Sequence, residues 1–85
     1  MDPTDNKVRD IVASVTGLSS DVSGEANLYL DLGVASIHAL QLLAELEKQF
    51  GVSIPDDEFV EATSIDQLIV MVRELLRSRE NPTHA

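Results

Sequence analysis

The amino-acid sequence predicts an all-α protein, an antiparallel four-helix bundle with three longer helices and one short third helix. Three segments place apolar residues at the three- and four-residue spacing of a helix, and no segment shows the strict alternation of a half-buried strand. Glycine, proline and serine separate these segments. Because 44% of the 85 residues are hydrophobic, the chain can form one core. We expect a single domain with its core at about residues 4–79 and a flexible tail at residues 80–85.

The first helix is expected to run from Thr4 or Asp5, either of which can cap it, to Thr16. Gly17 suits its end, because glycine readily adopts the left-handed conformation that closes many helices. The apolar face of this helix is formed by Val8, Ile11, Val12 and Val15.

A connection from Leu18 to Ala35 follows, and it is long for so small a domain. It contains serines and a glycine, but also the aliphatic residues Leu18, Val22, Leu28, Leu30 and Leu32. These apolar side chains indicate that the connection lies across the core.

The second helix is expected from Ser36 to about Phe50, with Gly51 at its end. Its apolar residues cover more than one face, whereas a surface helix normally has a single apolar stripe. The two series are Ile37, Leu40, Leu43 and Ala44, and Ala39, Leu42, Leu46 and Phe50. The extra apolar residues near the start of this helix are Ile37 and Leu40, and their position has two interpretations. Burial in the core is the commoner one, and exposure as a docking patch or a lining for cargo is the other.

Residues 52–55 should be extended, because a residue that precedes proline avoids helical angles. The acidic run at residues 56–58 then suits the start of a short helix, with Phe59 as its anchor. Ser64 and Gln67 have the spacing of a capping box, which opens the last helix. The apolar side of that helix comprises Ile65, Leu68, Ile69, Val72, Leu75 and Leu76.

The net charge of −9 is unevenly distributed along the chain. The segment from Ser19 to Asp66 contains ten acidic residues and one base, Lys48, whereas the two ends together are balanced. Such a field repels nucleic acid and anionic lipid and attracts basic protein surfaces. Partner docking is therefore favoured over nucleic-acid binding.

Catalysis and metal binding by this chain are not indicated. There is no cysteine, so thiolate zinc sites and a cysteine nucleophile are excluded. His38 lies two residues after Ser36, a spacing that points the two side chains to different sides of a helix, and no G-x-S-x-G motif surrounds the serine. No window supplies the ligands of an EF-hand. We therefore assign no catalytic and no metal-binding residue.

The first residues are polar and acidic, without the apolar core of a signal peptide, and no run approaches membrane-spanning length. We expect a cytoplasmic protein that is a monomer and does not insert into membranes.

One motif points to a specific function. It is centred on Asp31-Leu32-Gly33 leading to Ser36-Ile37, and further matching residues are Leu43, Leu46-Glu47, Phe50-Gly51, Ile54-Pro55-Asp56 and Asp57-Glu58. In these residues nearly the whole chain resembles the acyl carrier protein family. The pattern of that family is a Leu-Gly-x-Asp-Ser-Leu junction, an amphipathic helix with Leu-Glu and an aromatic residue, and an Ile-Pro-Asp turn. Its members are four-helix bundles with a short third helix.

The resemblance implies that Ser36 is the attachment point of 4′-phosphopantetheine, which a separate phosphopantetheinyl transferase would transfer from coenzyme A. Acyl or aminoacyl groups would then be held as thioesters, in fatty acid, polyketide or related specialised biosynthesis. A loading ligase and downstream synthase enzymes with basic docking surfaces would be the other partners, and the chain itself would not be an enzyme. The implied docking residues are Ile37, Leu40, Gln41, Ala44, Glu47, Asp56, Asp57 and Glu58.

The sequence departs from the family pattern at the residue before the serine, where Ala35 replaces an aspartate that helps the transferase recognise the carrier. Alanine is a poor N-cap, so we expect Ser36 to cap the helix in the unmodified protein. Gln41 and Lys48 also stand where fatty-acid-synthesis carriers are commonly acidic. An alternative therefore stays open at this point: a degenerate, unmodified module that keeps the fold and acts as an acidic protein-interaction domain.

Overall fold

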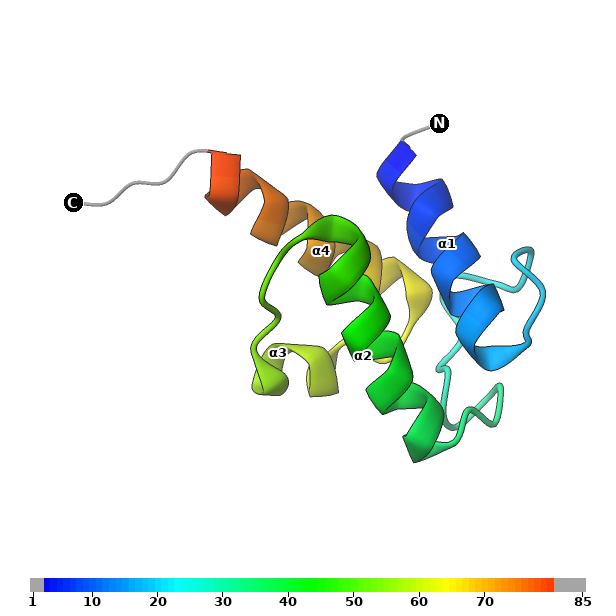
Figure 1. The fold of residues 1–85 in the computed structure, drawn as a ribbon. Helices are drawn as coiled ribbons and strands as arrows, with labels where there is room; N and C mark the ends of the chain where they lie inside the picture. The colour runs from blue at the N-terminus through cyan, green and yellow to red at the C-terminus, as the bar shows by residue number, and fades with distance from the viewer. Residues whose placement is uncertain (1–2, 81–85) are drawn as a thin grey trace.

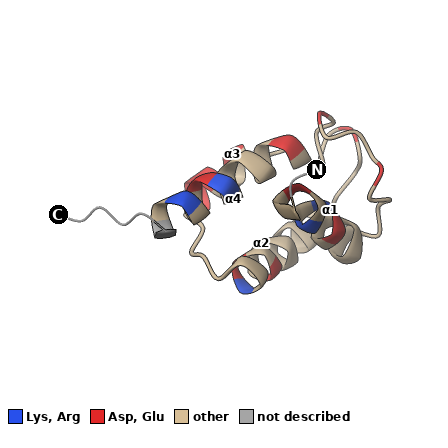
Figure 2. Cartoon of the chain, turned by 90° about the horizontal axis from the view of Figure 1, so that it is seen from above, with Lys and Arg blue, Asp and Glu red and all other residues tan. Residues whose placement is uncertain are grey.

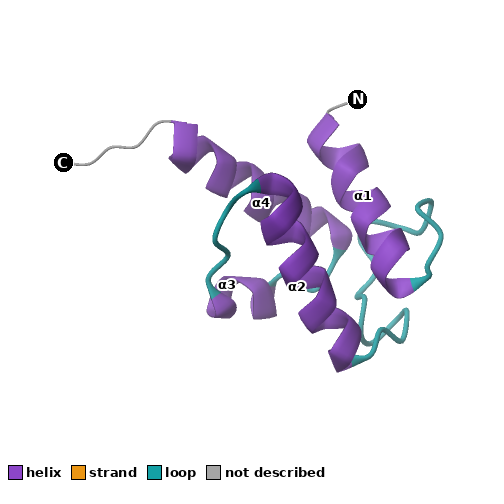
Figure 3. Cartoon of the chain, in the orientation of Figure 1, coloured by secondary structure: helices purple, strands orange, loops and turns teal. Residues whose placement is uncertain are grey.

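The computed structural model describes residues 3–80. These residues form the helices α1 (Pro3–Thr16), α2 (Ser36–Phe50), α3 (Asp56–Glu61) and α4 (Ile65–Glu80). Figure 3 shows that this part of the chain contains helices and loops but no strand. The predicted fold class, with three longer helices and a short third one, is confirmed. Apart from Glu80, which ends α4, the tail expected at residues 80–85 lies outside the described residues.

Helix α1 packs against both α2 and α4, and the short α3 packs against α4. Helices α1 and α2 run in opposite directions, while α4 crosses them obliquely (Figure 1). Among the helices of residues 3–80, none combines the length and the apolar character that are needed to span a membrane.

A single, largely aliphatic core joins the four helices. Every helix contributes to it, and so do the segments that precede α2, α3 and α4. Its buried members are Val8, Ile11, Val12, Leu28, Leu42, Leu46, Ile54, Phe59, Ala62, Ile65, Leu68, Ile69, Met71 and Val72. The predicted apolar faces of the first and last helices and the anchoring role of Phe59 are thereby confirmed.

The start of α1 differs from the prediction. Pro3 is the first helical residue, so Thr4 and Asp5 lie inside the first turn instead of capping it. Proline suits this position because its φ angle is already helical and its missing N–H would have no partner there. The Asp5 carboxylate instead accepts a hydrogen bond from the Arg73 guanidinium at 2.6 Å, which ties α1 to α4. The predicted end of α1 is confirmed, since Gly17 has a φ angle of 81°.

Three contacts fix the long connection between α1 and α2. The first comes from α1, where Arg9 donates hydrogen bonds to the carbonyls of Ser20 and Val22, at 2.9 and 2.8 Å. The second comes from α4, where the Asp66 N–H donates to the carbonyl of Gly24 at 3.0 Å. Gly24 is buried, and a Cβ atom added there would meet the Asp66 carboxylate, which would have to move aside.

The third contact is Leu28, which is fully buried in the core. Its N–H donates to the carbonyl of Thr63 at 2.8 Å, and its carbonyl accepts from the N–H of Val34 at 2.9 Å. Both backbone groups of this loop residue are thus satisfied, as burial requires. The prediction that the connection lies across the core is confirmed.

Leu30, two residues later, is 85% exposed. It belongs to a tight turn in which the Asn27 Oδ1 atom accepts from the N–H groups of Tyr29 and Leu30, while the Asp31 carboxylate accepts from the Asn27 N–H. Tyr29 is half-buried, and burial raises the pKa of its phenol above the usual value. The turn therefore places Leu28 in the core and Leu30 in solvent.

The start of α4 is the predicted capping box. The Gln67 N–H donates to the Ser64 hydroxyl at 3.2 Å, and the Ser64 N–H donates to the Gln67 side-chain oxygen at 3.2 Å. The same oxygen also accepts from the Thr63 N–H at 2.9 Å. Thr63, whose carbonyl accepts the hydrogen bond from the Leu28 N–H, is therefore itself held by the Gln67 side chain of the capping box.

We predict that Leu28→Ala lowers the free energy of unfolding by about 2–5 kcal/mol, because it deletes a buried side chain and leaves a cavity. That is a large share of the roughly 5–15 kcal/mol that stabilises a typical domain. Leu30→Ala is the matched control from the same loop, and its effect should lie within about 0.5 kcal/mol. Urea denaturation followed by circular dichroism measures both. Equal losses for the two variants would show that the connection does not contribute to the core as described.

Candidate functional site

The candidate site is the start of α2. Ala35 has extended backbone angles, φ −80° and ψ 155°, and its carbonyl accepts from the N–H groups of His38 and Ala39 at 3.0 and 3.2 Å. Ala35 is therefore the N-cap and Ser36 is the first helical residue. The expectation that Ser36 caps the helix is wrong, because the backbone already turns into the helix one residue earlier.

As a result the Ser36 hydroxyl remains available. The residue is exposed, and within residues 3–80 its hydroxyl forms no hydrogen bond. The N–H groups of Ser36 and Ile37 likewise have no partner in that range, since the alanine side chain at the N-cap cannot accept one. The first turn of α2 also contains no acidic residue. A negatively charged group on the serine oxygen would therefore meet free donors and the positive end of the helix dipole.

Two large apolar side chains follow the serine on the outer side of α2. Ile37 is 62% exposed and Leu40 is 68% exposed, so these two side chains are not buried in the core. Gln41 and Ala44 are exposed as well. The opposite side of the helix supplies Leu42 and Leu46 to the core, with Ala39, Leu43 and Phe50 packed partly against it. The apolar excess of this helix thus divides between a core face and a solvent face.

The predicted docking acids fall into two groups. Asp56, Asp57 and Glu58 are exposed in the first turn of α3, where the helix dipole favours them. Figure 2 shows acidic positions on α3 and along the α1–α2 connection, and basic positions on α4. Glu47 is different, because it is half-buried and its carboxylate accepts a hydrogen bond from the Ile54 N–H at 2.8 Å. The exposed acids form a surface that a partner can reach directly.

His38 is half-buried, and no hydrogen bond joins it to Ser36 among the described residues. Within the same part of the chain, no group of three or more histidine, aspartate or glutamate side chains is arranged to bind a metal ion. Within residues 3–80, then, no side chain is hydrogen-bonded to the Ser36 hydroxyl.

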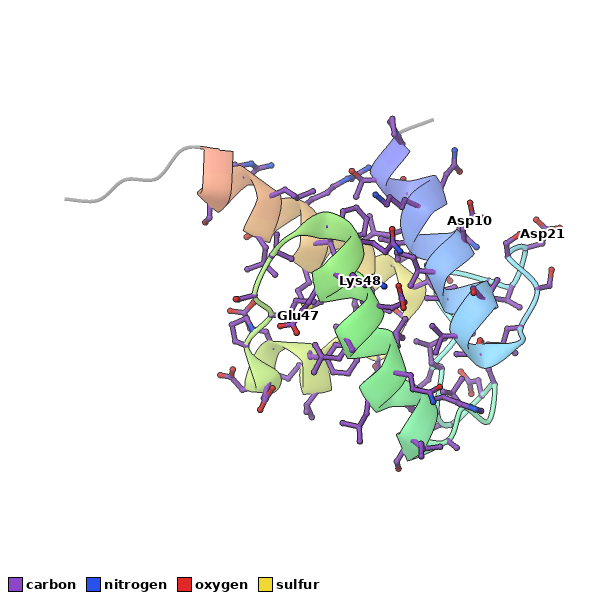
Figure 4. All side chains as sticks on the ribbon, in the orientation of Figure 1. Asp10, Asp21, Glu47 and Lys48 are labelled. Carbon is purple, nitrogen blue, oxygen red and sulfur yellow. The ribbon has the colours of Figure 1, made fainter. Side chains whose placement is uncertain are left out.

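A surface hollow of about 610 Å³ lies between α1 and the following connection. Asp10 and Asp21, labelled in Figure 4, are among its lining residues, and no residue of α2 is. The hollow is thus separate from the start of α2, where the candidate site is open to solvent.

A profile of the family described as phosphopantetheine attachment site matches residues 6–72, from the first turns of α1 into α4. The chain belongs to this family, which is the family of acyl carrier proteins. Its domains receive 4′-phosphopantetheine covalently and work as carriers with phosphopantetheinyl transferases and synthase enzymes. The resemblance drawn from the sequence and the expected prosthetic group are confirmed at this level.

The residues at the start of α2 fit such a group. The exposed hydroxyl can form the phosphodiester, the N–H groups of Ser36 and Ile37 are free to face its phosphate, and no first-turn acid would repel it. When bound, 4′-phosphopantetheine supplies a thiol, which this cysteine-free chain cannot provide from its own side chains. The sequence predicted a helix start at Ser36, and the structure confirms this start and adds that Ala35 is the N-cap.

We predict that Ala35→Asp and Ala35→Asn each raise the free energy of unfolding by about 1 kcal/mol, because a side-chain oxygen at the N-cap can accept from the free amides of α2. Because asparagine is neutral, it separates the effect of the capping hydrogen bond from the effect of a negative charge at the helix start. Ala44→Asn, at an exposed interior position of the same helix, should instead lower the value by a few tenths of a kcal/mol because asparagine is a weaker helix former. Urea denaturation measures all three variants. If neither substitution at position 35 raises the free energy of unfolding, the absence of a side-chain cap does not destabilise the start of α2.

Proposed function

We propose that Ser36 is the attachment point and that the chain carries acyl or aminoacyl intermediates as thioesters in fatty acid, polyketide or related specialised biosynthesis. The observation that supports the serine assignment is its free hydroxyl at the exposed start of α2. The match to the attachment-site family supports the carrier role, and residue 36 lies inside the matched range.

Another serine at a helix start provides a contrast. Ser64 precedes α4, but it is buried and its hydroxyl takes part in the capping box with Gln67. Modification there would break that box and require burial of a phosphate. The loop residue Ser53 is exposed, yet it lies in the extended segment before α3 and not at a helix start. Ser36 therefore combines access with a favourable local field.

The chain acts in this modification as the substrate. For the phosphodiester to form, the Ser36 oxygen must attack the pantetheine-bearing phosphorus of coenzyme A and lose its proton, while the pyrophosphate bond breaks and adenosine 3′,5′-bisphosphate leaves. No described side chain is hydrogen-bonded to that hydroxyl, so we expect the transferase to supply the proton acceptor. This agrees with a carrier that is acted upon by separate enzymes.

We propose further that partner enzymes contact the outer side of α2 and the start of α3. Ile37, Leu40 and Ala44 would give apolar contact, and Gln41 a polar one. The exposed acids Asp56, Asp57 and Glu58 would face basic grooves on a transferase, a loading ligase or a synthase. Between exposed charges, such attraction raises association rates more than it raises affinity, and salt weakens it.

The attachment site is tested by intact mass spectrometry after incubation with a broad-specificity phosphopantetheinyl transferase and coenzyme A. We predict one phosphopantetheine addition on the unaltered chain, none on Ser36→Ala, and one on the control Ser53→Ala. An addition that persists in Ser36→Ala would place the site elsewhere. If the unaltered chain stays unmodified while Ala35→Asp is modified, the missing aspartate blocks the reaction and the acidic interaction module becomes the better description.

The docking surface is tested by removing one charge. We predict that Asp57→Asn slows modification about two- to fivefold at an ionic strength of about 0.01 M, where the Debye length is about 30 Å. At an ionic strength of about 1 M, where the Debye length is about 3 Å, Asp57→Asn and the unaltered chain should be modified at nearly the same rate. Asp21→Asn removes an exposed acid of the α1–α2 connection and should slow the reaction less than Asp57→Asn does. A slowing of Asp57→Asn that is independent of salt would contradict charge-assisted docking at α3.

A further inference from the structure

The chain reversal between α2 and α3 depends on one residue. Helix α2 ends at Gly51, which has a φ angle of 66°, and the carbonyl of Glu47 accepts from the N–H groups of Gly51 and Val52 at 2.9 and 3.3 Å. The Glu47 carboxylate, through Oε2, accepts in addition from the Ile54 N–H at 2.8 Å. Three amides of the turn are thus bound to the backbone or side chain of Glu47.

The side-chain bond is the one that reaches beyond the helix end. Backbone bonds at a glycine C-cap close many helices and need no particular side chain. The bond to Ile54 instead spans seven residues and fixes the extended segment that leads into α3. Figure 4 shows the Glu47 side chain extending from α2 toward that segment. Because Ile54 is only 5% exposed, its N–H would have little access to water without this acceptor.

This bond holds the segment from which α3 starts. Helix α3 has only six residues, too few to be stable on its own, and it packs against α4. Its entry from α2 is fixed by the buried Ile54, and its own anchor is Phe59. The acids at 56–58 follow Ile54 almost directly. A looser turn would therefore displace these acids relative to Ser36 and the outer side of α2.

We propose that Glu47 is a positioning residue, whose carboxylate acts by holding the α2–α3 turn and not by presenting its charge to a partner. This proposal rests on the proposed function in one respect, since it takes the acids of α3 as part of the docking surface. It differs from the role that the family resemblance implied for Glu47, which is direct docking. The two roles predict different behaviour when the charge is removed and the hydrogen bond is kept.

The test compares Glu47→Gln with Glu47→Ala. Glutamine keeps an oxygen that can accept from the Ile54 N–H but has no charge, whereas alanine removes both. Glu45→Ala is the matched control, because the Glu45 carboxylate bonds to the Gln49 side chain on α2 itself and not to the turn. Each variant is incubated with the same transferase and coenzyme A at low and at high salt, and the rate of the mass addition is measured.

We expect Glu47→Gln and Glu45→Ala to react within about twofold of the unaltered chain at both salt concentrations. Glu47→Ala should react several-fold more slowly at low salt, because α3 and its acids are displaced, and its rate should approach that of the unaltered chain at high salt, where those acids no longer attract the partner. If Glu47→Gln is slowed as much as Glu47→Ala and high salt restores both, the carboxylate docks directly and the positioning role is wrong.

Hydrogen exchange of the Ile54 amide tests the bond without any partner. In the unaltered chain and in Glu47→Gln this amide should be protected, whereas in Glu47→Ala it should exchange about tenfold faster or more. The midpoint of thermal unfolding should fall by about 4–8 °C in Glu47→Ala and much less in Glu47→Gln. An Ile54 amide that exchanges equally fast in all three proteins overturns the proposal. This readout stands even if Ser36 is never modified, so failure of the carrier function and failure of the positioning role can be distinguished.

Discussion

The burial of Leu28 is the constraint on which the position of the candidate site depends. Its N–H is bound to Thr63, just before α4, and its carbonyl to Val34, two residues before Ser36. One loop residue therefore connects the core, the start of α4 and the start of α2. Without this connection, a segment as long as residues 17–35 would lose much conformational entropy for little gain on folding. With it, the junction that leads to Ser36 has a defined place on a small domain.

The same fixed junction explains how α2 can serve two purposes. Leu42 and Leu46 hold the helix to the core, and the bond from Lys7 Nζ to the carbonyl of Gln49, at 3.1 Å, ties the far end of α2 to α1. Because these contacts use the inner face and the C-terminal end, the N-terminal outer face is not needed for stability. Ile37 and Leu40 can then stay exposed beside the serine. A larger exposed apolar patch favours aggregation when no partner covers it, and it marks an interaction site when a partner does.

Much of this architecture could be predicted from local sequence signals. Gly17, Gly51 and the Ser64–Gln67 pair define helix ends through backbone conformation and capping, which act over a few residues. The features that escaped prediction depend on tertiary placement. Leu28 and Leu30 have the same side chain in one loop, and only the folded turn separates the buried residue from the exposed one. The N-cap at Ala35, the first turn from Pro3 and the bond from Glu47 to Ile54 likewise follow from the path of the backbone.

The exposed surface beside Ser36 is suited to contacts that form and dissociate. Complete burial of an isoleucine or leucine side chain contributes about 1.5–3 kcal/mol, and Ile37 and Leu40 already lose part of their exposure within the domain. Association costs roughly 4–15 kcal/mol in lost translational and rotational freedom, so these two residues alone cannot hold a partner. The remainder has to come from polar and charged contacts, and the acids at the start of α3 are the nearest exposed acidic group along the chain after α2. Salt screens such contacts, and they contribute little net free energy of binding. They therefore raise the rate at which a partner associates more than they lengthen the lifetime of the complex. A domain that works with a transferase and then with synthase enzymes needs that balance, because each partner must leave before the next one can bind.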